Sequence, residues 1–391
     1  MELRLRDRRV LVREEADDVE IVRAQGSFLY DGDGRRYIDF LSGAGAGNLG
    51  WTHDRVHARM QRFAGPPYVR PSFLYRPWVD LAEELAALAP GKLRKTLRAA
   101  TGTEAMEIAL QASMTATGRH KFLSVEGAYH GNSIATLSIG SSEYRGRYAN
   151  LLQDCYKIDP PLADRAARRA EAILKKRDIA AFVMEPIGCT LGVVIPRREF
   201  MTRLQELCRH YGTLFIADEV ATGFGRTGKV FASEHYDLEP DIMCLGKAIT
   251  GGYAPLAATM VTPAVAKALD PRIAYSSTYA WHPLAVEAAI ANVRLFRKRR
   301  DELMEQVARM GNYFRVRLSR MAFKQRAMVR ARGLALAVDL VKRSYAAKVR
   351  SRCREAGLIV GVEGSSIVMM PPLSIDKKTV RRGLDLLEEC L

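Results

Sequence analysis

Three residues with reactive side chains each follow a short apolar segment of the chain. They are Glu185 after AAFVM (180–184), Asp218 after TLFIA (213–217) and Lys247 after DIMCL (241–245) and one glycine. Strands of a parallel sheet end at one edge, where ligands bind, so we expect these side chains to converge. Each of these residues alone is weak evidence for a site, since an aspartate after a strand is often only a helix cap. Together they favour a lysine nucleophile with acids beside it.

The segment AATGTEAMEIAL (99–110) has the features of a phosphate site. Thr101 and Glu104 have the spacing of a capping box, which predicts a helix N-terminus. Gly102 and Thr103 would place small residues and free backbone N–H groups there, and this geometry attracts anions. An ordinary capped helix would explain the segment taken alone. The lysine and the strand-end carboxylates favour a bound phosphate.

A nucleophilic lysine, an aspartate and a phosphate site together indicate pyridoxal phosphate. Lys247 would join the aldehyde of this cofactor, and Asp218 would keep the pyridine nitrogen protonated. The flat ring needs contacts on both faces, for which Tyr129 in GAYHGNS and Val220 are the candidates. Once released, the lysine amine could carry a proton between the substrate and the cofactor.

The elements that must position these residues alternate between helices and strands from about residue 80. Helical apolar spacing occurs in WVDLAEELAALAP (78–90), EAMEIALQASMTATG (104–118) and REFMTRLQELCRHYG (198–212). Earlier, GSFLYDGDGRRYIDF (26–40) predicts two short strands joined by a turn. Buried strands that alternate with helices predict an α/β fold with a mostly parallel sheet covered on both faces.

The composition is typical of a large enzyme. Of the 391 residues, 48% are hydrophobic, and the net charge of +16 is spread along the chain without aromatic–basic interleaving. We therefore expect no nucleic-acid partner. Neither a signal-like start nor an apolar run of membrane length occurs, so we expect a cytoplasmic protein without a membrane partner. The six cysteines are scattered, which predicts reduced thiols and no metal site.

The sequence resembles the class III pyridoxal-phosphate aminotransferases of fold type I, the ω-aminotransferase group, over nearly its whole length. The motifs that carry the resemblance are TGTEAMEIAL, GAYHG, VMEPIG, ADEVATGFGRTG, LGKAITGG and STYAWHPLA. The aspartate segment with its following lysine is the most specific of these. We predict a large cofactor-binding domain at 46–285 and a smaller α/β domain made of 1–45 and 286–391.

The resemblance implies a role for each matching residue. These roles are a Schiff base at Lys247, a partner for the pyridinium nitrogen at Asp218, ring contacts from Tyr129 and Val220, phosphate binding by Gly102 and Thr103, and a place near the substrate side of the ring for Glu185. Thr278 would bind the phosphate of the neighbouring subunit's cofactor, so the resemblance implies a homodimer. His130 would support the site structurally.

Two positions in the C-terminal segment depart from the family pattern. Relatives hold a substrate carboxylate with an arginine at the position of Gly361 or of Val368, within GLIVGVEGSSIVMMPPL (357–373). Neither glycine nor valine replaces a bidentate guanidinium. Either the amino donor lacks a carboxylate near the reacting carbon, or another arginine binds it. Arg70 in PPYVRPSF is our candidate, although a plain surface role explains Arg70 equally well.

The predicted function is a transaminase, a transferase that uses pyridoxal phosphate. It would move an amino group between a primary amine or amino acid and a keto acid or aldehyde. The apolar segment before PPL favours an amine or a β- or ω-amino acid with a hydrophobic side pocket as donor. A racemase, epimerase or aminomutase on the same fold is the alternative. A scaffold or nucleic-acid-binding protein is suggested only by the charge, and no G-x-G-x-x-G supports a dehydrogenase.

Overall fold

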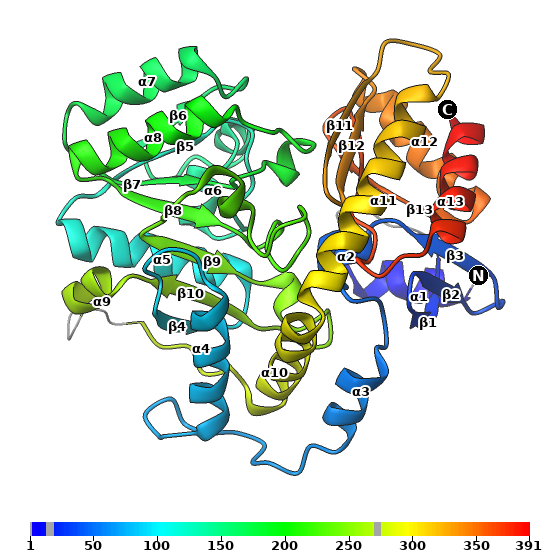
Figure 1. Cartoon of the computed structure of the whole chain (residues 1–391), viewed down its shortest axis with the longest axis horizontal. Coiled ribbons are helices and arrows are strands. Elements are labelled where there is room, and N and C mark those ends of the chain that lie inside the picture. The colour runs from blue at the N-terminus through cyan, green and yellow to red at the C-terminus, as the bar shows by residue number, and fades with distance from the viewer. Residues whose placement is uncertain (1, 13–18, 270–274) are drawn as a thin grey trace.

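The computed structural model describes residues 2–12, 19–269 and 275–391 of the chain. Figure 1 shows one large sheet with its helices and, beside it, a smaller group of strands and helices that contains both chain ends. The described strands form three sheets, one of seven strands and two of four strands. The predicted α/β fold is confirmed.

The seven-stranded sheet lies at the centre of the large part, in the order β4-β10-β9-β8-β7-β5-β6. Its strands are β4 (Lys95–Ala99), β5 (Lys121–Val125), β6 (Cys155–Ile158), β7 (Ile179–Met184), β8 (Leu214–Asp218), β9 (Ile242–Leu245) and β10 (Ala257–Val261). Only β10 runs antiparallel to its neighbours, and the other neighbouring strands pair in parallel. The mostly parallel sheet predicted from the sequence is therefore observed.

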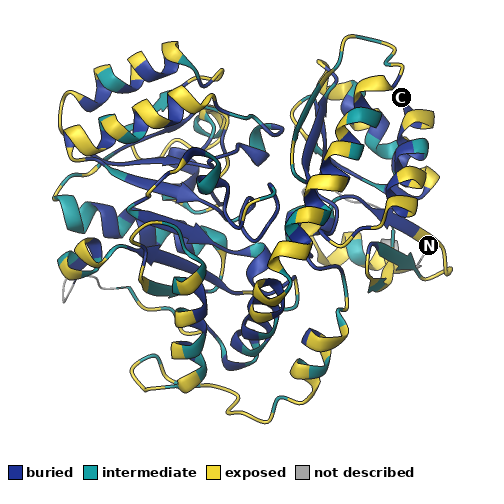
Figure 2. Cartoon of the chain, viewed as in Figure 1, coloured by how far each residue is buried: buried dark blue, intermediate teal, exposed yellow. Residues whose placement is uncertain are grey.

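Helices cover this sheet and explain why its central strands are apolar. They are α4 (Arg76–Leu88), α5 (Gly102–Thr117), α6 (Ile134–Ile139), α7 (Asp164–Leu174), α8 (Arg198–Tyr211), α9 (Pro263–Leu269) and α10 (Pro283–Lys298). Figure 2 shows the central strands as buried and the outer helix faces as exposed. Every residue of β7 and β9 is buried, as expected for strands covered on both faces.

The smaller part joins the two ends of the chain. One of its sheets contains β1 (Ile21–Gln25), β2 (Phe28–Asp31), β3 (Arg36–Asp39) and β13 (Leu358–Ile359); the other contains β11 (Met328–Arg332), β12 (Ala335–Asp339), β14 (Gly361–Glu363) and β15 (Ser366–Met369). The parallel pairing of β3 with β13 brings the N-terminal strands onto the C-terminal segment.

The remaining elements are short helices and the helices of the smaller part. They are α1 (Glu2–Val10), α2 (Ser42–Gly45), α3 (Asp54–Gln61), α11 (Arg300–Arg320), α12 (Arg343–Ala356), α13 (Lys377–Cys390) and the 3₁₀ segments η1 (Ser142–Gly146), η2 (Cys189–Leu191), η3 (Ala232–Tyr236) and η4 (Lys247–Ile249). The predicted domain boundary at residue 285 falls inside α10, which packs against α3 and α4. The division into 46–285 and the two flanking segments remains a prediction.

The loop after Asp218 is tied to the C-terminal strands. Arg226 in this loop is fully buried, and its Nη1 donates to the carbonyls of Pro371, at 2.5 Å, and of Leu334, at 3.3 Å. The backbone N–H of Leu334 in turn donates to the Arg226 carbonyl at 2.9 Å. The turn between β11 and β12 therefore helps to hold the loop that follows β8.

Gly333 in that turn is held against the loop so closely that a side chain does not fit. Its φ is +58°, and a Cβ on it would lie 2.4 Å from the carbonyl carbon of Thr227. Gly364, in the turn between β14 and β15, has a φ of +59° but open space around it. We expect Gly364→Ala to lower the free energy of unfolding by about 1 kcal/mol through backbone strain alone.

The close contact should make Gly333→Ala worse by a further ~1–3 kcal/mol, because the backbone of the loop must move. Urea denaturation of both variants beside the parent protein measures the difference. Equal losses in the two variants would show that the turn does not clamp the loop.

Candidate active site

A cavity of about 180 Å³ lies at the carboxyl ends of β7, β8 and β9. Residues from several loops and from the start of α5 line it: Gly102, Thr103, Tyr129, His130, Gly131, Glu185, Thr190, Asp218, Val220, Ala221 and Lys247. The three strand-end residues that the sequence predicts to converge, Glu185, Asp218 and Lys247, share this cavity. So do the predicted ring and phosphate contacts.

Lys247 reaches the cavity from an unusual backbone conformation. It follows Gly246 at the end of β9 and has a φ of +41°, in the left-handed region that few non-glycine residues adopt. Such strain persists only where the surrounding packing fixes it, and it is concentrated at functional sites. Gly246 is packed against Val220, since a Cβ on it would lie 3.2 Å from Cγ1 of the valine. The lysine side chain itself is half-buried.

Asp218 is the last residue of β8, and its carboxylate is held from two sides. His130 Nδ1 lies 2.7 Å from Oδ2, and the backbone N–H of Val220 donates to Oδ1 at 3.1 Å. Both side chains of the Asp218–His130 pair are buried. Nε2 of His130 has no hydrogen-bond partner among the described residues. Hydrogen donation from Nδ1 fixes the carboxylate in one orientation beside the cavity.

The start of α5 supplies free backbone donors. Thr101 is the N-cap residue, and its hydroxyl accepts from the backbone N–H of Glu104 at 3.2 Å, as the spacing predicts. The Glu104 carboxylate closes the cap by accepting from the N–H of Ala100. The N–H groups of Gly102 and Thr103 find no acceptor within the described parts of the chain, as is usual for a first helical turn.

Two glycines keep the space beside these donors open. A Cβ on Gly102 would lie 3.1 Å from Cγ1 of Val220. Gly131 has a φ of +134°, and a Cβ on it would lie 2.6 Å from Oγ1 of Thr103. A side chain at either position would intrude on the first turn of α5 or on the valine, so the glycines preserve a narrow cradle there.

Glu185 is buried behind the lysine and the aspartate. Its carboxyl oxygens accept from the backbone N–H groups of Cys189, at 3.0 Å, and Thr190, at 3.2 Å, and from the Thr190 hydroxyl. Burial raises the pKa of Glu185 to about 8, and the nearby charge of Asp218 adds to this rise. The amine of Lys247 offsets part of it. The carboxyl group is therefore mostly protonated at neutral pH.

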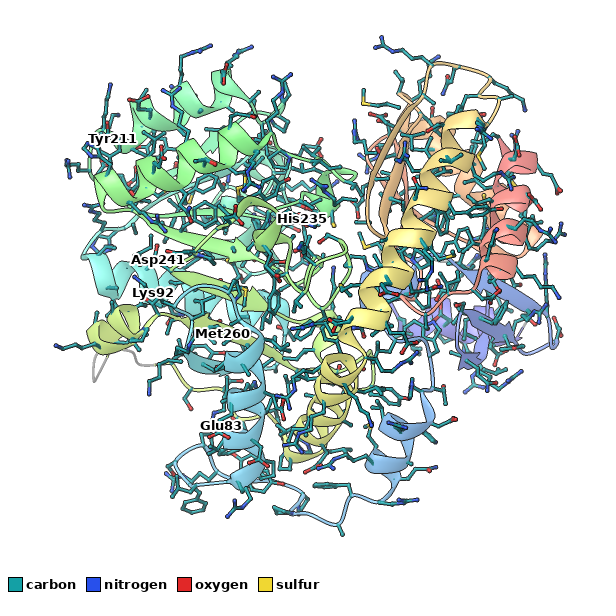
Figure 3. All side chains as sticks on the ribbon, viewed as in Figure 1. Glu83, Lys92, Tyr211, His235, Asp241 and Met260 are labelled. Carbon is teal, nitrogen blue, oxygen red and sulfur yellow. The ribbon has the colours of Figure 1, made fainter. Side chains whose placement is uncertain are left out.

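Two predicted site residues do not line this cavity. Thr278 lies in the turn before α10 and Arg70 in the loop before α4, and both are exposed. Asp241, labelled in Figure 3, lies at the amino ends of the central strands, where its carboxylate accepts from the backbone N–H of Phe215 at 2.9 Å. It marks the start of β9, whereas Lys247 follows its end.

Some lining residues were not predicted to contact the cofactor. They are His130, Gly131, Thr190 and Ala221. His130 and Gly131 belong to the GAYHG motif, which was the available signal, and Ala221 belongs to the DEV segment. Thr190 has no such signal. In the described residues no group of three or more histidines, cysteines or acidic residues could hold a metal ion, and no helix is long and apolar enough to cross a membrane.

The residues present fit pyridoxal phosphate. The free N–H groups at the start of α5 suit its phosphate, the buried Asp218 suits its pyridine nitrogen, and the amine of Lys247 suits its aldehyde. The side chains of Val220 and Tyr129 line the same space and can cover a flat ring.

Fold and site together define a pyridoxal-phosphate-dependent transferase of fold type I. The chain belongs to the class III aminotransferase family, whose model, "Aminotransferase class-III", matches residues 11–391. The predicted family, cofactor and aminotransferase activity are confirmed. The comparisons below give no support to the racemase alternative.

Two curated relatives and one solved structure illustrate the similarity. The 5-aminovalerate aminotransferase of Pseudomonas aeruginosa is 32% identical over 94% of this chain and 92% of its own length. The putrescine aminotransferase of Pectobacterium atrosepticum is 32% identical over 93% of this chain and 80% of its own. The omega transaminase from Pseudomonas jessenii in complex with PMP superposes with a TM-score of 0.93 at 25% identity, covering 99% of this chain and 96% of that one.

The raised pKa of Glu185 makes a pH-dependent prediction. From about pH 4.5 to about pH 8 the unfolded chain loses this proton while the folded chain keeps it, so stability falls as the pH rises. Glu185→Gln removes the titration. We expect the variant to gain stability relative to the parent between pH 5 and pH 8, by on the order of a few kcal/mol.

Urea denaturation of the parent and of Glu185→Gln at pH 5 and at pH 8 measures this change. At pH 5 the parent carboxyl group is protonated, so the difference there reports mainly how well the amide packs. A stability difference that does not vary with pH would mean that Glu185 is ionised in the folded protein.

Proposed function

We propose that the cavity at Lys247 transfers an amino group from a primary amine or a β- or ω-amino acid to a keto acid or aldehyde, in two half-reactions. The observation that carries this proposal is the presence of Lys247, Asp218 and the start of α5 on one cavity. Two relatives are named as aminotransferases of 5-aminovalerate and of putrescine, and these names favour a donor whose amine ends a flexible carbon chain. An amino donor added alone should convert the bound cofactor to its amine form, whereas a racemase would leave it unchanged.

When bound, pyridoxal phosphate supplies an electron sink that stabilises negative charge on the substrate carbon. We assign the surrounding roles to this chain's own residues. Lys247 Nζ would hold the cofactor through its aldehyde carbon, and its free amine would take a proton from the substrate carbon and deliver it to that aldehyde-derived carbon. Asp218 holds the proton on the pyridine nitrogen, and His130 keeps the carboxylate in place by donating to it.

The remaining lining residues bind and orient. The N–H groups of Gly102 and Thr103 bind the phosphate, helped by the positive end of the α5 dipole. Tyr129 and Val220 hold the ring between them. Glu185, neutral at pH 7, forms the wall on the substrate side without adding a second full negative charge beside Asp218.

A homodimer would complete the site, with Thr278 binding the phosphate in the partner subunit. Support comes from exposed apolar side chains near Thr278 and Arg70. Tyr68 and Tyr279 are 43% and 66% exposed and pack edge to face with ring centroids 6.4 Å apart, and Leu74 is 97% exposed. Contiguous exposed aromatic groups are typical of an interface. Sedimentation should return twice the 43.6 kDa chain mass, and a monomer would remove this assignment. We also propose a cytoplasmic location.

Replacing the lysine tests the covalent role. Lys247→Ala should abolish turnover, because Lys247 is the one amine among the described residues that line the cavity, and borohydride should no longer fix the cofactor to the protein. Mass spectrometry of the reduced protein measures the fixation. Lys267→Ala, an exposed lysine on α9, is the control and should behave as the parent does. Retained labelling in Lys247→Ala would exclude the residue from the mechanism.

Replacing the aspartate tests the charge on the ring. Asp218→Asn should leave the fold and the content of bound cofactor largely intact but lower kcat by on the order of 10²-fold or more, because the pyridine nitrogen loses its charged partner. Asp241→Asn at the other edge of the same sheet is the matched control. Steady-state rates and circular dichroism are the measurements. Near-normal kcat in Asp218→Asn would contradict the electron-sink role.

A further inference from the structure

A second cavity of about 210 Å³ adjoins the first and shares Thr190, Ala221 and Lys247 with it. Its other walls come mostly from the smaller part of the molecule. They are apolar at Leu41, Ala44, Val362, Val368 and Met370. Two further charged residues line it, Arg350 from α12 and Glu363 from β14. A molecule whose amine meets the cofactor at Lys247 can therefore extend along an apolar wall towards charged groups.

The two positions that lack the expected arginine lie opposite each other in this cavity. Gly361 on β14 pairs with Val368 on β15, and both line the space. A Cβ on Gly361 would lie 2.8 Å from Cγ2 of Val368 and 2.9 Å from Cδ1 of Leu41. A side chain at 361 would therefore require Val368 and Leu41 to shift. A cation that serves this cavity must come from another element.

Arg350 meets that requirement. Helix α12 packs against both β14 and β15, and Arg350 is half-buried on it. Besides Lys247, which is assigned to the cofactor, it is the cationic residue among those described as lining the cavity. A guanidinium binds a carboxylate through two parallel N–H donors, a geometry that an ammonium cannot reproduce.

The buried Arg226 adds to the positive potential of the same wall. Its Nε is 3.8 Å from the position that a Cβ on Gly45 would take, and Gly45 follows the lining residue Ala44 in the chain. Its Nε and Nη2 have no hydrogen-bond partner among the described residues. None of the described salt bridges pairs Arg226 with a carboxylate. The positive potential of Arg226 stabilises an anionic group in the cavity.

We propose that Arg350 determines substrate specificity by binding the carboxylate at the far end of the amino donor. This assignment rests on the proposed function and refines it. The enzyme then prefers ω-amino acids to alkylamines and diamines of the same chain length, because only the former carry an anion for Arg350. The carboxylate of Glu363, on β14, repels the carboxylate of the donor.

The test compares donors that differ only at the far end. Holoenzyme is mixed with ω-amino acids of three to six carbons, and with the n-alkylamines and diamines of equal length, and the cofactor spectrum reports the half-reaction. Arg350→Leu should raise the half-saturating concentration of the best ω-amino acid on the order of tenfold to hundredfold, and that of the matching alkylamine by less than about threefold. Arg350→Lys should restore part of the loss.

Two further variants and a binding measurement separate specificity from damage. Arg343→Leu, at the exposed start of the same helix, should match the parent. Glu363→Gln should lower the half-saturating concentration of ω-amino acids, opposite in direction to Arg350→Leu. Calorimetry with pentanoate, a carboxylate that cannot react, should show weaker binding to Arg350→Leu than to the parent. Equal melting temperatures of the variants establish that they fold.

The outcomes distinguish this inference from the proposed function. If no donor converts the cofactor in the parent enzyme, the proposed function fails. If donors convert it but Arg350→Leu affects amines and ω-amino acids equally, or neither, only the assignment of Arg350 fails. A parent enzyme that prefers diamines to ω-amino acids also overturns that assignment.

Discussion

The buried carboxylate of Asp218 is the constraint on which the site depends. A charge at the end of a covered strand is costly unless it is paired, and His130 at 2.7 Å, the N–H of Val220 and a cationic ring nitrogen are the groups that can stabilise it. The same burial and the same charge raise the pKa of Glu185 to about 8. One fixed negative charge at this edge therefore leaves the neighbouring acid neutral and gives the cavity a single orientation for a cofactor.

Close packing around glycines keeps that edge narrow. Gly102 and Gly246 both lie against Val220, and Gly131 lies against Thr103, so the valine and the first turn of α5 bound a thin space rather than a wide pocket. A flat heterocycle suits such a space. The strained backbone of Lys247, with a φ of +41°, directs the amine from the end of β9 into it. The end of the sheet, the close-packed glycines and the strained backbone of Lys247 together fix the position of the lysine amine.

The strand ends were predictable because parallel, fully covered strands leave an apolar signal that stops where the chain meets the site. β7, β8 and β9 end at Met184, Asp218 and Leu245, within one residue of the sequence-based prediction. The φ of Lys247 and the contact of His130 with Asp218 depend on packing between distant segments and have no local pattern. Thr278 and Arg70 are exposed and lie outside the cavity, so the single chain leaves their predicted roles as predictions. Arg350 lies on a basic helix, where periodicity does not distinguish a solvated arginine from one that lines a cavity.

The two cavities divide the chemistry between the two parts of the molecule. The edge of the large sheet supplies the amine, the carboxylate and the phosphate donors, whereas β14, β15 and α12 supply most of the wall along which a substrate extends. The loop after Asp218 links the two parts, because Arg226 in it donates hydrogen bonds to the carbonyls of Leu334 and Pro371. Because the loop that begins beside the ring partner also anchors the substrate wall, a shift in the small strands changes the distance from the reacting carbon to Arg350. With Arg350 as the carboxylate-binding residue that we propose, the accepted substrate length depends on how the two parts pack together as well as on the residues around the cofactor.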